Sequence, residues 1–164
     1  MTVTFDATPL IGPTVLDRLY MRADQAMARP PDEIIEDRYL RRWHSLRGSA
    51  LSLYVHLYVG SDPCAWAHDH PWPSLSLCLQ GTLIETAEPS DGCRQTSKIS
   101  RGTVAYRPPR FSHRLDLISG PAVTLFLVGP RLREWGWHLP GGWRPWHEVS
   151  GVDEDGVTRI RYPP

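Results

Sequence analysis

Two histidines stand two positions apart at the head of residues 68–81, where His-Asp-His-Pro-Trp leads into an apolar run typical of a buried strand. Side chains of a strand alternate between its two faces, so His68 and His70 are expected on one face and Asp69 on the other. Two imidazoles that converge from one face are suited to bind a transition metal. The segment therefore predicts two ligands of a metal site, and a third has to come from elsewhere.

His113 is the candidate for the third ligand. It follows Gly102 and Pro108 in the run Gly-Thr-Val-Ala-Tyr-Arg-Pro-Pro-Arg-Phe-Ser-His. Over about residues 48–130 the chain resembles the cupins, whose first motif pairs His-x-His with a later glycine, here Gly81. The second cupin motif has glycine, proline and histidine at the spacing of Gly102, Pro108 and His113. Arg110 stands where that motif usually has glycine.

The sequences at the two ends of this region resemble one particular group of cupins. The His-Asp-His-Pro-Trp start, together with the tryptophan-rich ending Glu-Trp-Gly-Trp-His and Gly-Trp-Arg-Pro-Trp, resembles a group of small bacterial and phage-associated cupins. The resemblance implies a double-stranded β-helix, the jelly-roll-like cupin barrel. It assigns no activity within that group.

One departure from the cupin pattern concerns the ligand set. Ser74 stands where many metal-binding cupins have a glutamate ligand, so the site implied is a neutral set of His68, His70 and His113. Such a set resembles that of three-histidine cupin dioxygenases. Imidazoles suit Fe, Zn, Cu or Ni, with Mn a further option, so the ligand types alone do not choose the metal. The resemblance to the dioxygenases implies Fe(II) as the favoured metal. A carboxylate from elsewhere, such as Glu85, stays open as an alternative.

Several polar and aromatic residues near these motifs are candidates to bind a substrate. They are Ser74, Ser76, Tyr106, Arg107, Arg110 and Trp72. The two serines share the parity of the histidine pair, and an arginine can bind a carboxylate through paired hydrogen bonds. Trp72 follows the pair and is placed to wall the cavity. The other histidines, His44, His56, His138 and His147, are interpreted as surface or hydrogen-bonded core residues.

The helices and strands that position these residues are predicted from the spacing of apolar residues and from the glycines and prolines that mark turns. Apolar residues recur every three or four positions over 14–28, which predicts a helix, and a weaker helical turn is expected over 32–37. Strands are expected at 51–59, 73–80, 82–88, 98–106, 113–118, 122–129 and 157–162. The sequence predicts a mainly β protein, a cupin barrel with one or two N-terminal helices. Its expected parts are an N-terminal arm and helical segment, 1–47, packed on a barrel, 48–164, that includes the tryptophan-rich segment.

Composition limits the partners and the compartment. The 164 residues carry 18 basic and 18 acidic side chains, so no nucleic-acid footprint or membrane-surface charge is expected. No apolar run approaches the ~20 residues of a membrane helix, and no signal peptide is evident. The three cysteines lack Cys-x-x-Cys spacing, which favours reduced thiols and a cytoplasmic location.

These features favour a metal-dependent cupin, in particular a mononuclear non-haem iron oxygenase acting on a small molecule. Two alternatives stay open: a non-catalytic ligand-binding or accessory module, and a redox-neutral metal-dependent isomerase or lyase. The expected partner is a small-molecule substrate, with no nucleic acid and no membrane. A homodimer is possible through the N-terminal strands.

Overall fold

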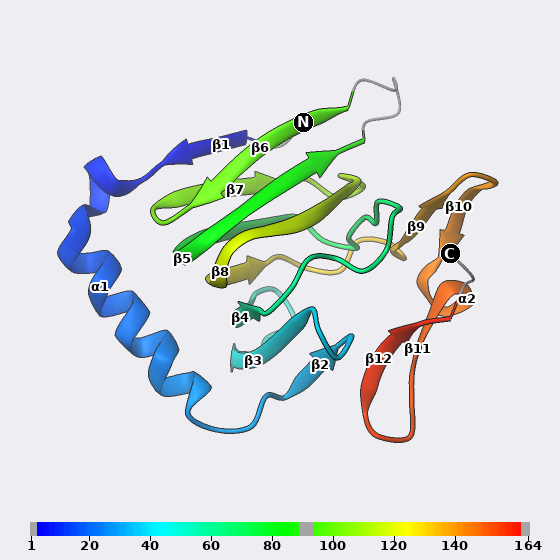
Figure 1. The fold of residues 1–164 in the computed structure, drawn as a ribbon, viewed down its shortest axis with the longest axis horizontal. Coiled ribbons are helices and arrows are strands. Elements are labelled where there is room, and N and C mark those ends of the chain that lie inside the picture. The colour runs from blue at the N-terminus through cyan, green and yellow to red at the C-terminus, as the bar shows by residue number, and fades with distance from the viewer. Residues whose placement is uncertain (1–2, 89–93, 162–164) are drawn as a thin grey trace.

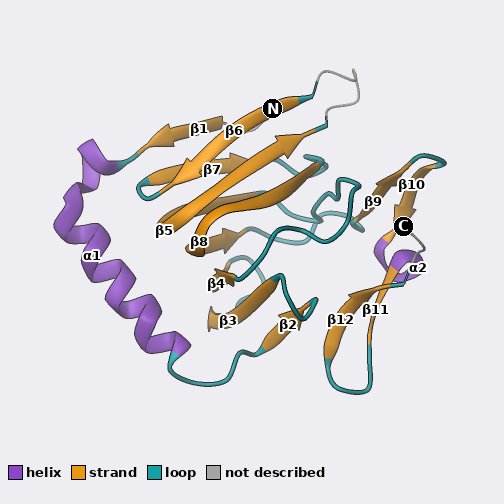
Figure 2. Ribbon diagram, viewed as in Figure 1, coloured by secondary structure: helices purple, strands orange, loops and turns teal. Residues whose placement is uncertain are grey.

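The computed structural model describes residues 3–88 and 94–161, which form a mainly β structure with two helices (Figures 1 and 2). The strands are β1 (Val3–Asp6), β2 (Glu33–Ile35), β3 (Leu40–Leu46), β4 (Ser52–Tyr58), β5 (Ser74–Ala87), β6 (Gln95–Ser100), β7 (Thr103–Arg107), β8 (His113–Val128), β9 (Gly136–Leu139), β10 (Gly142–Pro145), β11 (Ser150–Val152) and β12 (Val157–Ile160). The helices are α1 (Thr8–Met27) and α2 (Trp146–Val149). The mainly β class predicted from the sequence is confirmed.

Ten of the described strands form one sheet. Pairing runs in the order β1-β7-β5-β8-β4-β3-β2-β12-β11, and β6 pairs with β5 outside this path. Strands β9 and β10 form a separate two-stranded sheet, and β9 is bridged to the segment that carries His68. Within the part of the chain that the structure describes, β1 and β11 end the path without pairing to each other. The sheet curls, but its strands do not close into a complete barrel.

Two long antiparallel strands, β5 and β8, form the centre of the fold. The sequence predicts a break in each, at Gln80-Gly81 and at Ser119-Gly120-Pro121, but each continues as one strand. The turn residues instead produce shifts in the β5–β8 register between Cys78 and Leu83. Gly81 has φ 78°, and a side chain there would lie 2.6 Å from the Ala122 Cα. The two glycine-containing points therefore bend a paired ribbon rather than end it.

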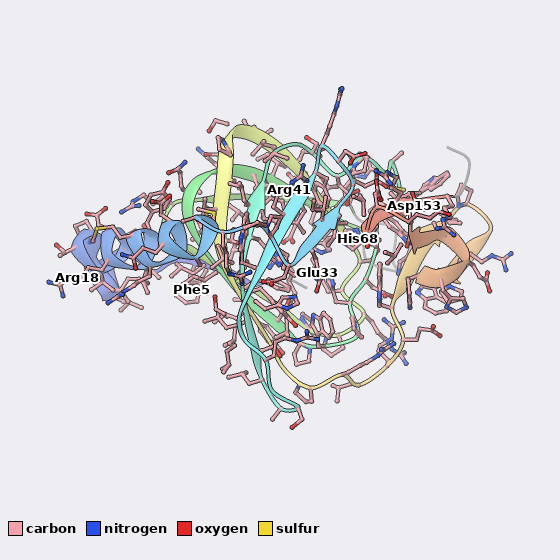
Figure 3. The ribbon with its side chains drawn as sticks, turned by 90° about the horizontal axis from the view of Figure 1, so that it is seen from below. Phe5, Arg18, Glu33, Arg41, His68 and Asp153 are labelled. Carbon is pink, nitrogen blue, oxygen red and sulfur yellow. The ribbon has the colours of Figure 1, made fainter. Side chains whose placement is uncertain are left out.

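Helix α1 covers one face of the sheet. It begins six residues before the predicted start, because the chain passes Pro13 through a kink at Gly12, where φ is 71°. Leu16 and Ala23 of α1 are buried and pack with core residues of the sheet, Trp43, Val55, Leu79 and Val123. Figures 1 and 3 place α1 at one end of the molecule, with His68 and Asp153 toward the other. The helix stabilises the sheet away from the candidate site.

The segment between α1 and β4 differs from the sequence prediction. The helical turn expected over 32–37 is wrong: residues Glu33–Ile35 form β2, which pairs antiparallel with β3 and parallel with β12. Ile34 and Ile35 are β-branched residues, which favour strands, and they lie next to β3, with which they can pair. These two factors outweigh the weak helical pattern of the segment. Strands β2 and β3, both N-terminal to residue 48, are thus integral to the main sheet.

The C-terminal segment packs against the ligand-bearing end of the sheet. Trp137, Leu139 and Val149 form a buried cluster with Cys64, and β12 pairs with β2. Cys64 and Cys78 are buried free thiols, whereas Cys93 lies outside the described residues. No helix in the described ranges is long and apolar enough to cross a membrane.

Candidate metal centre

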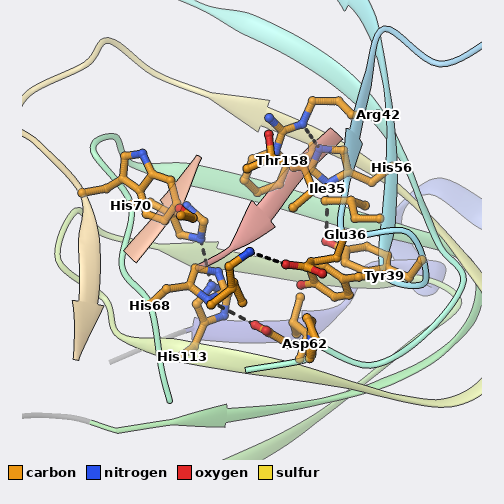
Figure 4. Close-up of a pocket in the computed structure, with 18 of the residues that line it drawn as sticks. Ile35, Glu36, Tyr39, Arg42, His56, Asp62, His68, His70, His113 and Thr158 are labelled. Carbon is orange, nitrogen blue, oxygen red and sulfur yellow. Dashed lines mark hydrogen bonds and ion pairs between the residues drawn. The ribbon is translucent and has the colours of Figure 1, made fainter. Parts of the chain in front are cut away.

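The three histidines predicted as ligands come together in space. His68 and His70 lie in the segment between β4 and β5, and His113 begins β8. One ring nitrogen from each lies within 4.8 Å of the others, and the Nε2 atoms of His70 and His113 are 2.9 Å apart (Figure 4). In the part of the chain that the structure describes, no carboxylate oxygen belongs to this group.

This spacing fits a transition-metal ion. Imidazole nitrogens bind such ions at ~2.1 Å, so two ligands at right angles around one ion are separated by about 3 Å. The 2.9 Å between the His70 and His113 Nε2 atoms matches that separation. The His70–His113 pair therefore fits two ligands of one divalent transition metal, and a ring nitrogen of His68 lies within 4.8 Å of both.

Backbone pairing holds the ligand segment in an extended conformation. The backbone amides of His68 and His113 each donate to the other's carbonyl at 2.9 Å, and Asp69 donates to Gly136 at 3.0 Å. The segment thus lies between the start of β8 and β9, although it is too short to be a regular strand. The predicted alternation holds, because the Asp69 side chain binds the C-terminal segment on the opposite side from the histidine cluster.

Glu85 orients His113 from behind rather than joining the ligand group. Its Oε1 lies 2.5 Å from His113 Nδ1 and accepts a 2.5 Å hydrogen bond from Arg107 Nε. Burial raises the pKa of Glu85, but Arg107 and His113 outweigh it and lower that pKa to about 2. The anionic carboxylate holds a proton on Nδ1 of His113, which directs the Nε2 lone pair toward the cluster. Such carboxylate partners fix the ring of a metal-binding histidine.

His68 has a comparable partner. Its Nδ1 lies 3.2 Å from Oδ2 of Asp62, whose other oxygen accepts a hydrogen bond from the Cys64 amide at 3.1 Å. Asp62 follows β4, and Figure 4 shows its carboxylate beside the histidine group. Two of the three imidazoles are therefore backed by buried carboxylates that do not themselves reach the cluster.

Burial keeps two of the clustered rings, those of His70 and His113, neutral near pH 7. It lowers the pKa of His113 to about 4, although Glu85 acts in the opposite direction. Burial also lowers the pKa of His70 well below its ordinary value, and the neighbouring His113 and His68 add to this effect. Neutral imidazole is the form that binds a metal.

A cavity of ≈ 160 Å³ opens beside the histidines. Its walls are mainly apolar and aromatic and include Leu115, Phe126, Trp135 and Trp137. An apolar cavity of ~150 Å³ is known to hold a benzene-sized molecule. The space therefore suits a small molecule, with the histidines at one end.

The predicted substrate-binding residues divide into two sets. Trp72, Ser76 and Arg107 line the cavity, and Arg107 donates a 2.8 Å hydrogen bond to Ser76 Oγ. The other three lie outside its lining: Ser74 is buried in the sheet, whereas Tyr106 and Arg110 are exposed. Tyr106 and Arg107 are neighbours on β7, so strand alternation allows only one of them to face inward.

The cavity residues that were not predicted from the sequence include Arg42 on β3, and His56 and Tyr58 on β4. His56 was interpreted as a structural residue. A signal was present in the alternation of β4, which turns His56 and Tyr58 the same way. The direct pairing of Arg42 with His56 across β3 and β4 depends on the strand register.

A second buried group surrounds Asp69. Its oxygens lie 2.9 Å from the Gly136 amide, 3.1 Å from Trp143 Nε1, 3.2 Å from His138 Nε2 and 2.9 Å from Arg133 Nη1. Burial raises the pKa of Asp69, but His138, the Gly136 amide and Arg133 together hold it below its ordinary value. We call Asp69 and these four partners the tail cluster. It fastens the C-terminal segment to the residue between the two histidines.

The comparisons with known proteins identify the fold. No family model and no curated protein sequence matches the chain. An oxalate decarboxylase studied for proton-coupled electron transfer superposes with a TM-score of 0.51 and 19% identity over 65% of this chain and 29% of that one. The Lactobacillus farciminis oxalate decarboxylase formate complex superposes with a TM-score of 0.51 and 16% identity, over 61% of this chain and 31% of that chain. A Bacillus subtilis oxalate decarboxylase variant superposes with a TM-score of 0.50 and 19% identity, over 67% of this chain and 30% of the variant's chain.

These similarities establish architecture alone. The chain spans about 30% of the length of the oxalate decarboxylases it matches. Those enzymes are cupins, and the shared arrangement of strands is the one the sequence motifs predict. The protein has a cupin-type β fold that brings three histidines together at one end of a small cavity.

Proposed function

We propose that this protein is a metal-dependent cupin enzyme whose one metal ion is held by His68, His70 and His113. The observation that carries the proposal is the convergence of three ring nitrogens within 4.8 Å, at the end of a cavity large enough for a small substrate. Glu85 and Asp62 support this role, because Glu85 is hydrogen-bonded to the far nitrogen of His113 and Asp62 lies 3.2 Å from that of His68. Two independent supporting carboxylates are typical of a ligand set rather than of histidines that merely fill a core.

The proposed reaction is an oxygenation, with Fe(II) favoured as the metal. Because three neutral imidazoles add no negative charge, the ion keeps its full positive charge and has positions left for substrate and dioxygen. A ferrous ion would supply the electrons that dioxygen chemistry needs. The chain's own contribution is to orient the rings and to exclude water with its aromatic walls. Trp72, Ser76 and Arg107 are the candidates from the predicted set that lie where a substrate would bind.

The ligand assignment is tested by metal analysis of the purified protein. We expect about one metal per chain after reconstitution with Fe, and loss of that metal in His68→Ala and His113→Ala. His147→Ala is the matched control, since His147 is exposed and ion-paired with Glu134. Absence of bound metal after reconstitution with Fe, Zn, Ni, Cu and Mn would overturn the proposal.

The reaction class is tested by dioxygen uptake with thiols, amino acids and 2-oxo acids. Uptake by the Fe-loaded protein that disappears with Zn supports an oxygenase. Equal turnover with Fe and Zn indicates instead a redox-neutral lyase or isomerase. The likeness to oxalate decarboxylases makes small carboxylic acids the first compounds to try for that alternative. Binding without turnover in either form identifies a non-catalytic module.

A further inference from the structure

A one-way chain of hydrogen bonds lies along the cavity, at the end away from the histidine cluster. Arg42 donates from Nη1 to Glu33 at 2.8 Å and from Nε to His56 Nε2 at 2.9 Å. His56 Nδ1 in turn lies 3.4 Å from the Tyr58 hydroxyl oxygen. Figure 4 shows His56 beside Arg42, across the cavity from His70 and His113.

The chemistry of these groups fixes the direction of every proton. A guanidinium has only donors, so His56 Nε2 has to accept from Arg42. His56 is 2% exposed, and burial, reinforced by Arg42, lowers its pKa well below the ordinary value. The ring is therefore neutral and carries its one proton on Nδ1. That proton points to the Tyr58 oxygen, which accepts it.

Tyr58 is left with a proton of its own to donate. Burial raises the pKa of Tyr58 to about 12, so the hydroxyl stays protonated at neutral pH. Among the described residues, none other than His56 forms a hydrogen bond with this hydroxyl. The Tyr58 side chain lines the cavity. A buried donor without an acceptor is costly, so a molecule in the cavity is the partner that satisfies it.

The acceptor that best fits this position is anionic. The guanidinium of Arg42 lies directly behind His56, and that of Arg107 faces the same cavity. Two carboxylates line the cavity, and both are engaged. Asp62 accepts from the Cys64 amide and pairs with His68, and Glu36 accepts from the Ile160 amide. Each guanidinium is paired with a carboxylate outside the cavity lining, Arg42 with Glu33 and Arg107 with Glu85. The free Tyr58 donor favours an oxyanion over a neutral carbonyl, because a hydrogen bond to an ionised acceptor is roughly twice as strong.

We propose that Tyr58, oriented by His56 and Arg42, forms a carboxylate-binding subsite in the cavity, opposite the three histidines. Tyr58 is the binding residue, and His56 and Arg42 are positioning residues. The assignment rests on the proposed function only in taking this cavity as the substrate site. It predicts a small organic acid whose carboxylate binds Tyr58 while its reacting end faces the histidines. The ≈ 160 Å³ volume limits the acid to roughly the size of benzoate.

The test compares the affinity of benzoate with that of benzamide, its neutral isostere, by calorimetry on metal-free and Zn-loaded protein. We expect benzoate to bind more tightly, and Tyr58→Phe to weaken benzoate binding by about 10-fold or more while changing benzamide binding little. His56→Gln is expected to reduce the benzoate-to-benzamide ratio by a smaller factor. Tyr20→Phe, a change on α1 away from the cavity, is the matched control and is expected to have no effect.

Metal content, measured on the same samples, separates this proposal from the proposed function. Tyr58-dependent benzoate binding in protein that never takes up metal would support the subsite while the metal assignment fails. Equal benzoate affinity in wild type and Tyr58→Phe, in both forms of the protein, would overturn the subsite. Equal affinity of wild type for benzoate and benzamide would also overturn it. Thermal unfolding of each variant confirms that a lost affinity does not reflect a lost fold.

Discussion

Glu85 and Asp69 are both 1% exposed, and each binds an arginine and a histidine, yet they serve different parts of the molecule. Glu85 contacts His113, a candidate ligand, and Arg107, which lines the cavity. Asp69 lies between two candidate ligands in sequence but binds only the C-terminal segment. Burial and residue type alone do not distinguish a site residue from a structural one. The identity of the partners does.

The contrast predicts different consequences for the same chemical change. Replacing the carboxylate at Asp69 is expected to release the tail, with metal affinity reduced only secondarily. Replacing the carboxylate at Glu85 is expected to act first on the ligand geometry. The predictions below test this division.

The largest expected effect is on stability, for Asp69→Asn. The substitution leaves Arg133 without its counter-ion and the buried amide of Gly136 without a charged acceptor. Breaking a buried ion pair costs about 3–5 kcal/mol, and we expect a loss near the lower end because Arg133 is partly exposed. Urea unfolding measures it, with Asp17→Asn, an exposed ion pair, as the matched control expected to change little. A decrease of less than ~1 kcal/mol in the free energy of unfolding would show that the tail cluster does not hold the C-terminal segment in place.

The next effect is on metal affinity, for Glu85→Gln. An amide cannot hold the His113 Nδ1 proton as a carboxylate does, so the ligand ring loses its fixed orientation and part of its basicity. Loss of such a partner typically weakens metal binding about 10–100-fold. Titration of the metal-free protein with Zn measures the change. Should Asp69→Asn weaken Zn binding by the same factor, the proposed division of roles between the two carboxylates would be wrong.

A smaller effect is expected on the pH dependence of stability, for His56→Gln. It tests whether the buried His56 ring, which lines the cavity, is neutral. The pKa of His56 is depressed in the folded state, so below pH ~6.5 the unfolded chain binds a proton that the native state does not. Stability is therefore lost as pH falls. His56 contributes at most ~1.4 kcal/mol per pH unit to that loss, the limit for one proton. His56→Gln should show a correspondingly shallower decline in urea unfolding, and an unchanged slope would contradict a neutral His56.

The smallest expected effect is that of Trp143→Phe. The indole nitrogen of Trp143 donates a 3.1 Å hydrogen bond to Asp69, and the Arg133 guanidinium lies over the ring. Phenylalanine keeps a ring for Arg133 but removes the donor, which is expected to cost about 1 kcal/mol in unfolding free energy. Asp69 retains its other partners, so Zn affinity should not change. A loss as large as that of Asp69→Asn would indicate that the indole, rather than the ion pair, fastens the tail.

Strand alternation and motif spacing were sufficient to predict the ligand group. Alternation puts His68 and His70 on one side and Asp69 on the other, and the spacing of Gly102, Pro108 and His113 pointed to the third histidine. These features are local, because they depend only on the geometry of an extended chain and on short turns. The mainly β class followed in the same way from the distribution of short apolar runs.

The residues that support the ligands were decided by strand register. His113 pairs with Ala87, and Leu115 with Glu85, so Glu85 and His113 are diagonal neighbours on one face of β5 and β8. Arg42 and His56 are opposed across β3 and β4 in the same manner. A shift of one residue would turn each of these side chains to the other face.

The sequence by itself therefore determined the mainly β class, the His68–His70 pair, its opposed Asp69 and the candidate His113. Only the tertiary structure decided that Glu85 lies behind His113, that Asp69 holds the tail and that Tyr58 faces the cavity with a proton to donate. The physical reason is that alternation acts within one strand, whereas partners on different strands depend on a register set by bends at Gly81 and Gly120 and by packing of the whole sheet.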